Sequence, residues 1–218
     1  AARERLAQLY IYTRQYQLAL YQLDTMLVQN QNNAQAYFMK GMVFKETGDT
    51  GKAVSSMQTA VEQDPDYYNA YIQLGMIHAA KHSKLAVDYY LNAIKVQPNS
   101  VEAMYNLGKF YQDENQYPLA IETYTTLLKA DARYYNAYYN IGAIQLEKLN
   151  QYEAAIKNFN LAIESNNRDP RAFFGRGLCY ERLKDNNHAI EDYRQVLLLD
   201  PESQNAREAI DRILGKGK

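Results

Sequence analysis

Two of the three histidines, His78 and His82, have the spacing that best suits metal chemistry. They lie four residues apart, so on a helix their imidazoles would share one face and could bind the same ion. No cysteine or acidic residue at ligand spacing joins them, whereas a structural zinc site needs four ligands. We therefore expect neither a metal nor another cofactor.

Cys179 is the single cysteine, and His188 follows nine residues later, as a base could follow its nucleophile. The thiol falls, however, at a packing position of a predicted helix, where cysteine behaves as a small hydrophobic residue. The sequence also lacks a glycine-rich phosphate loop and a G-x-S-x-G motif. We therefore expect a protein that is not an enzyme, and one cysteine excludes an internal disulfide.

The composition narrows the class of partner. Lys and Arg number 24 against 25 Asp and Glu, which argues against nucleic acid, because phosphate binding needs a clustered positive field. No apolar run approaches the ~18 residues of a membrane span, so we expect no membrane insertion. The chain begins with Ala-Ala rather than Met, so a removed targeting segment stays open, as does the compartment, cytoplasm or bacterial envelope.

A repeat of about 34 residues organises the whole chain. The segments "PDYYNAYIQLG" and "ARYYNAYYNIG" lie 67 residues apart, which is two such units. Glycines recur in one phase, at Gly41, Gly75, Gly108, Gly142 and Gly177. Alanines recur in another, at Ala19, Ala53, Ala86, Ala120, Ala155 and Ala189, each followed four residues later by a large apolar side chain.

Each unit has the pattern of two helices. In the unit that begins at Val101, Met104, Leu107 and Tyr111 recur at three- and four-residue spacings, and a second stripe starts after Asn115. The glycine and the alanine are small because two helices cross closely there, and the large residue beside them fills the groove. Only ten glycines and five prolines occur, so the sequence predicts an all-α fold.

These units resemble the tetratricopeptide repeat. The stretches "AYIQLGMIH" and "AYYNIGAIQ" are similar to its first helix, and "AVSSMQTAVEQDP" and "AIEDYRQVLLLDP" to its second. The resemblance implies a right-handed α-solenoid of about six repeats in a single domain over residues 1–218, with the units 1–33, 34–67, 68–100, 101–134, 135–169 and 170–203. A last amphipathic stretch over 204–215, with Ile210, Ile213 and Leu214 on one face, is expected to be its capping helix.

In this family the first helices line a concave face that binds peptides. When the family's inward-facing positions of the first helix are matched residue by residue to this sequence, the expected peptide-binding residues are Phe38, Met39, Met42, Ile72, Gln73, Met76, Tyr105, Asn106, Lys109, Tyr139, Asn140, Arg171, Phe174 and Leu178. Amide side chains can both donate to and accept from a peptide backbone, and methionine adapts to varied partners. The alternative is that these residues only follow the family consensus and pack.

The resemblance implies a scaffold or adaptor that binds an extended peptide or a helix of a partner protein. The family's carboxylate clamp is not expected, because no three consecutive units supply its lysine, asparagine and arginine positions. A second hypothesis is a self-assembly module, which includes a homo-oligomer, or the targeting arm of a larger protein whose active domain is absent from this chain.

Overall fold

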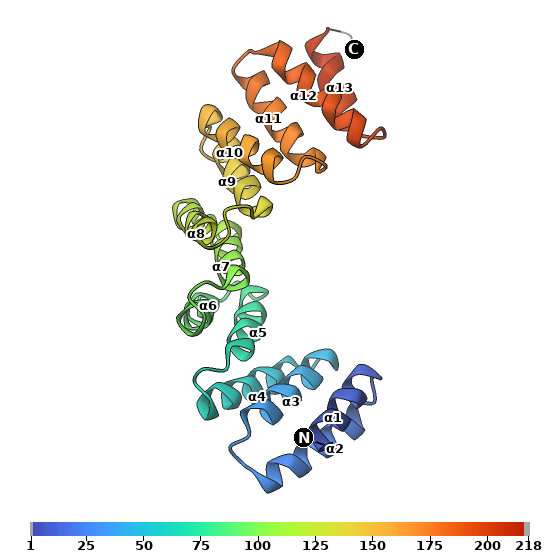
Figure 1. Cartoon of the computed structure of the whole chain (residues 1–218), viewed down its shortest axis with the longest axis vertical. Helices are drawn as coiled ribbons and strands as arrows, with labels where there is room; N and C mark the ends of the chain where they lie inside the picture. Colours follow the sequence, from blue (N-terminus) through green and yellow to red (C-terminus); the bar gives the residue numbers. More distant parts are fainter. Residues whose placement is uncertain (1, 216–218) are drawn as a thin grey trace. The chain divides into compact units, whose positions relative to one another are not determined.

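A computed structural model describes residues 2–215, and over this range the chain consists of helices and turns without a strand (Figure 1). The prediction of an all-α repeat fold is confirmed. The described range contains the thirteen helices α1 (Ala2–Tyr12), α2 (Tyr16–Gln29), α3 (Ala34–Glu46), α4 (Thr50–Gln63), α5 (Tyr68–Ala79), α6 (Leu85–Val96), α7 (Val101–Asp113), α8 (Tyr117–Ala130), α9 (Tyr135–Glu147), α10 (Tyr152–Ser165), α11 (Pro170–Arg182), α12 (Asn186–Leu199) and α13 (Gln204–Ile213).

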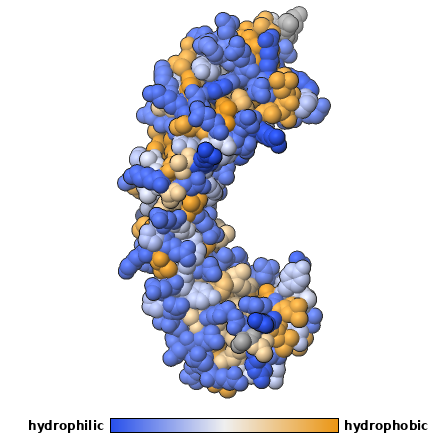
Figure 2. All heavy atoms as spheres, in the orientation of Figure 1, coloured by the Kyte–Doolittle hydropathy of each residue, from blue (hydrophilic) through white to orange (hydrophobic). Residues whose placement is uncertain are grey.

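The helices form two compact units, Ala1–Phe110 and Tyr111–Lys218, and the division falls inside α7. Odd-numbered helices up to α11 are the first helices of the repeats, and even-numbered helices are the second ones. On the face seen in Figure 2, apolar and polar side chains are interspersed over each unit. The single domain expected over residues 1–218 stays a prediction.

Small residues let the two helices of a repeat approach each other. All six of the periodic alanines are fully buried. A Cβ atom built on Gly75 would lie 2.5 Å from the Tyr90 ring, and one built on Gly177 would lie 2.8 Å from the Tyr193 ring. Both distances are far below van der Waals contact, so an aromatic ring of the second helix occupies the space that each glycine leaves open.

Two kinds of turn join the helices. The turn from a first to a second helix contains one residue with positive φ in every repeat, at Arg14, Gly48, His82, Asn115, Asn150 and Lys184. The turn to the next repeat is closed in most cases by an Asn or Asp side chain that accepts a hydrogen bond from the backbone N–H two residues later, at Asn30, Asp64, Asp131, Asn166 and Asp200. This Asx turn forms even where no proline follows.

Helix α13 covers the end of the second unit. Its Ala206 and Ala209 are buried against the cluster of Tyr193 and Val196 on α12, and Ile210 and Ile213 pack partly against the same cluster. Leu214, expected on the same apolar face, is 47% exposed because it follows the last helical turn.

Candidate partner-binding surface

Two of the expected peptide-binding residues are buried in the first unit. Met39 is 6% exposed and packs in one core cluster with Leu23 and Val43, and Ile72 is 2% exposed. A side chain in the core has no free surface to offer a partner, so we leave both residues out of the candidate surface. Their positions in the repeat match the family pattern, but burial against neighbouring helices takes precedence.

Other expected residues of the first unit are partly or fully accessible. Phe38 and Met42 are half-buried against a second core cluster, which includes Met57 and Leu74, and the Phe38 ring centroid lies 5.2 Å from that of Tyr67. Gln73 is half-buried, and its side-chain oxygen accepts a hydrogen bond of 2.7 Å from Lys45 Nζ. Along α7, Tyr105 and Asn106 are half-buried and Lys109 is exposed.

Met76 has the most exposed apolar side chain among the expected binding residues, at 41%. It contributes to a cavity of about 310 Å³, the Met76 pocket, which is lined by Lys45, Thr50, Met76, Ile77, Ala80 and Lys81. The pocket therefore lies between the ends of two successive first helices, α3 and α5, the start of α4 and the turn that follows α5.

In the second unit, Arg171 is fixed in place by ionic and aromatic contacts. Its Nε and Nη2 atoms donate to the carboxylate of Asp169 at 2.6–3.1 Å, and its guanidinium carbon lies 4.9 Å from the ring centroid of Tyr139 and 5.5 Å from that of Tyr135. The two tyrosine rings are stacked, with centroids 6.0 Å apart. Bidentate pairing and cation–π contact orient Arg171 before any partner arrives.

The electrostatics of this cluster keep the ion pair charged and the phenols neutral. The hydrogen bonds that Arg171 donates to Asp169 raise the pKa of Arg171. Burial opposes ionisation of Asp169, but the hydrogen bonds from Arg171 outweigh it and lower the pKa of the carboxyl. Burial raises the pKa of Tyr135 and of Tyr139 above the ordinary tyrosine value. The cluster is thus an ion pair without net charge, beside two uncharged tyrosine rings.

Three of the expected residues, Tyr139, Arg171 and Phe174, meet in one cavity of about 220 Å³, the Tyr139 pocket. The remaining lining residues are Pro170, Val196, Asp200, Ser203 and Asn205. Those from 200 onward come from the turn before α13 and from α13 itself. Sequence reasoning missed them because it assigned that helix only a capping role, although the same helix follows a complete repeat in the position of a further first helix.

Asn140 and Leu178 take part in internal packing. The Asn140 amide donates to the hydroxyl of Tyr124 at 3.1 Å, and that hydroxyl donates to the Gln112 side-chain oxygen at 3.1 Å. Leu178 is half-buried between two core clusters of the second unit. The Asn140 amide group is therefore already engaged within the fold.

His78 and Cys179, which were considered for metal binding and nucleophilic chemistry, are both packed against other side chains of the fold. His78 is half-buried and stacked on Tyr89, and burial lowers the pKa of its imidazole. Cys179 is buried, which raises the pKa of its thiol to about 12 and keeps it protonated. Among residues 2–215, no group of three or more His, Cys, Asp or Glu side chains could hold a metal ion.

The described helices are also too short or too polar to cross a lipid bilayer.

Sequence patterns of the tetratricopeptide repeat match residues 34–67, 89–122, 135–169 and 170–203. The chain is 24% identical, over 213 residues and 88% of its length, to the DnaJ homolog subfamily C member 7 homolog of Dictyostelium discoideum. It spans only 39% of that protein's length, and 11% of the length of the general transcriptional corepressor ssn6 of Schizosaccharomyces pombe.

Solved structures share the fold at low identity. The C-terminal part of a TPR repeat-containing protein from Cytophaga hutchinsonii superposes with a TM-score of 0.85 at 20% identity, covering 95% of this chain and 86% of that one. YrrB, a TPR protein with an unusual peptide-binding site, gives a TM-score of 0.70 at 19% identity, covering 86% and 96%. The repeat matches span more than half of the chain, and together with the helix pairs they show that it belongs to the tetratricopeptide repeat family.

Proposed function

We propose that this chain is a non-catalytic interaction scaffold that binds an extended segment or a helix of a partner protein along its first helices. The observation that carries the proposal is the Tyr139 pocket, where Tyr139, Arg171 and Phe174 meet beside α13. Its volume of about 220 Å³ is large enough to receive a side chain of a larger partner.

The chemistry of the Tyr139 pocket supports the same proposal. Aromatic and aliphatic walls from Phe174 and Val196 can bury an apolar side chain, and Ser203 and Asn205 can donate to and accept from a peptide backbone. Arg171 is held by Asp169, so the pocket loses little side-chain entropy when a partner binds. The similarity in fold to YrrB, whose structure has a peptide-binding site, favours a peptide as the ligand.

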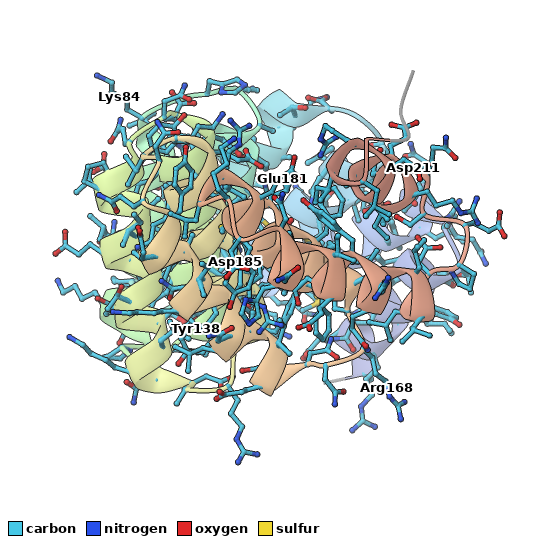
Figure 3. The ribbon with its side chains drawn as sticks, turned by 90° about the horizontal axis from the view of Figure 1, so that it is seen from above. Lys84, Tyr138, Arg168, Glu181, Asp185 and Asp211 are labelled. Atoms are coloured by element: carbon cyan, nitrogen blue, oxygen red, sulfur yellow. The ribbon has the colours of Figure 1, made fainter. Side chains whose placement is uncertain are left out.

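Affinity capture from the source organism tests the proposal with a variant that fills the pocket. Asn205→Trp adds bulk at an exposed residue of the pocket rim, and Asp211→Trp places the same side chain on another exposed part of α13 (Figure 3). We expect a partner that the wild type and Asp211→Trp retain and that Asn205→Trp loses, with all three chains equally helical by circular dichroism. Equal capture by all three chains contradicts a role for the pocket.

Self-association is the second candidate, and exposed apolar residues in the first repeat favour it. Helix α2 carries Leu18, Tyr21 and Val28 on one stripe, with Tyr21 65% and Val28 82% exposed. Sedimentation at rising concentration tests this candidate: a mass increase that Tyr21→Lys with Val28→Lys abolishes supports it, and a constant monomer mass contradicts it.

A further inference from the structure

The Met76 pocket of the first unit combines apolar lining residues with two lysines and no acidic lining residue. Met76 and Ile77 supply the floor, and Lys45 and Lys81 are the charged residues among those that line it. No acidic side chain belongs to the lining. The nearby Asp49 is paired with Lys52 at 2.9 Å and accepts the Lys52 backbone N–H, so its charge is already balanced.

A hydrogen bond to Gln73 on α5 orients the side chain of Lys45, which lies near the end of α3. Its Nζ atom donates to the Gln73 side-chain oxygen at 2.7 Å, which leaves two ammonium hydrogens for a further acceptor. Lys84 lies on the same turn as Lys81 but points away from the ribbon in Figure 3. The positive charge of the pocket is therefore a property of Lys45 and Lys81 rather than of every lysine in this region.

The repeat itself provides a comparison within the same chain. A second cavity, in the other unit, is lined by residues 67 positions later, which is the offset of two repeats. Lys45, Thr50, Met76, Ile77, Ala80 and Lys81 correspond in this way to Gln112, Tyr117, Ala143, Ile144, Glu147 and Lys148. That second cavity also includes Asp113, so acidic residues outnumber basic ones there. A cavity thus recurs at equivalent positions of two repeats, whereas the excess of basic over acidic residues occurs in the Met76 pocket and not in the second cavity.

Lysines near a helix C-terminus also offset the helix dipole, which gives Lys45 a modest stabilising role. That effect cannot account for the exposed thioether of Met76 or for the absence of acids from the lining. Equivalent ends of α7 and α9 carry no basic residue in their last turns, so the fold does not require one there.

We infer that the Met76 pocket binds an acidic segment of the partner protein in which a carboxylate side chain lies next to a large apolar one. The apolar side chain would contact Met76, whose flexible thioether adapts to different shapes, and the carboxylate would bind between Lys45 and Lys81. This inference rests on the proposed function, because it names the chemistry of the segment that the scaffold binds.

Selection from a displayed random-peptide library tests the inference without a known partner. The double variant Lys45→Gln with Ala80→Glu gives the Met76 pocket the residues that Gln112 and Glu147 supply in the other cavity. Lys84→Gln removes one lysine charge from a side chain that points away from the ribbon, and it is the control for the loss of a lysine in this region. All chains are first compared by thermal melting, so that a loss of fold is recognised.

We expect the wild type and Lys84→Gln to enrich peptides with Asp or Glu beside a large apolar residue, and the double variant to lose that enrichment. A selected acidic peptide should bind the double variant about fivefold more weakly or worse, and its affinity for the wild type should fall with salt. Enriched peptides without acidic residues, or equal losses in the double variant and Lys84→Gln, overturn the inference and leave the proposed function standing. If the wild type enriches no peptide and Asn205→Trp loses no captured partner, the proposed function itself is contradicted.

Discussion

Tyr124 is a single side chain that connects three elements of the second unit. It is fully buried, and its hydroxyl lies between Gln112 near the end of α7 and Asn140 on α9, at 3.1 Å from each partner atom. From the sequence alone, Asn140 is predicted to bind a peptide, because of its position in the first helix of its repeat. In the structure the Asn140 amide donates a hydrogen bond to the buried Tyr124 hydroxyl. This contact cannot be predicted from the sequence, because it depends on how the second helix packs against the first helix of the next repeat.

Tyr124→Phe is predicted to destabilise the chain by about 1–2 kcal/mol. The ring still fills the space between the helices, so the loss comes from the two hydrogen bonds and from polar groups left without their partner. Urea denaturation followed by circular dichroism measures the change. Tyr117→Phe is the control, because the Tyr117 hydroxyl contacts only the neighbouring Asn115 at an exposed site. An equal effect of both substitutions would contradict this account.

At the scale of elements, the turn between the helices of a repeat imposes the same backbone conformation on six different residues. Lys184 has φ 65° and Gly48 has φ 83°, both in the left-handed region. A non-glycine residue pays about 1–2 kcal/mol for this conformation. The cost explains why Gly48 suits its turn, while Lys184 occupies the equivalent turn under strain.

Lys184→Gly is therefore predicted to stabilise the chain by about 0.5–1 kcal/mol, since relief of the strain exceeds the entropy that glycine adds to the unfolded state. Gly48→Ala should have the opposite sign and a similar size, because a Cβ atom at Gly48 would meet nothing within 4 Å and only the backbone opposes it. Denaturation midpoints measure both effects. Changes of the same sign would show that side-chain contacts, and not φ, control these turns.

Helix α13 is attached to α11 by an ion pair as well as by apolar packing. Glu181 accepts hydrogen bonds of 2.9 Å from Nε and Nη2 of Arg212 and one of 2.8 Å from the Tyr193 hydroxyl. Hydrogen bonding from Arg212 lowers the pKa of Glu181 below its ordinary value. Because the folded pKa is depressed, this stabilisation is complete above the unfolded pKa of about 4.3 and is lost as the pH falls through the folded value.

Arg212→Met is accordingly predicted to be less stable than the wild type at pH 7, with a difference that shrinks as the pH falls below about 4. Denaturation midpoints at pH 7, 5 and 3.5 measure it, and hydrogen exchange of the α13 amides locates it. A difference that stays constant over this range would mean that Arg212 acts only through packing.

At the scale of the whole molecule, the repeat made the helices predictable and the binding residues much less so. Glycine and alanine in a fixed phase are enough to place each helix pair, because only small residues allow the close crossing seen at Gly75 and Tyr90. The family positions of Met39 and Ile72 indicated binding, yet the neighbouring helices bury both. Ala80, in the turn after α5, and Asn205, in the first turn of α13, also line pockets, although neither belongs to the family's first-helix binding positions.

Hydroxyl-radical footprinting of the chain with and without its captured partner shows directly which helices the partner covers. We predict that the partner protects Met76 and Phe174, which line the Met76 pocket and the Tyr139 pocket, and leaves Leu91 and Leu161 on second helices as reactive as before. Protection of Leu91 and Leu161, with Met76 and Phe174 unchanged, would contradict it and place the partner on the second helices.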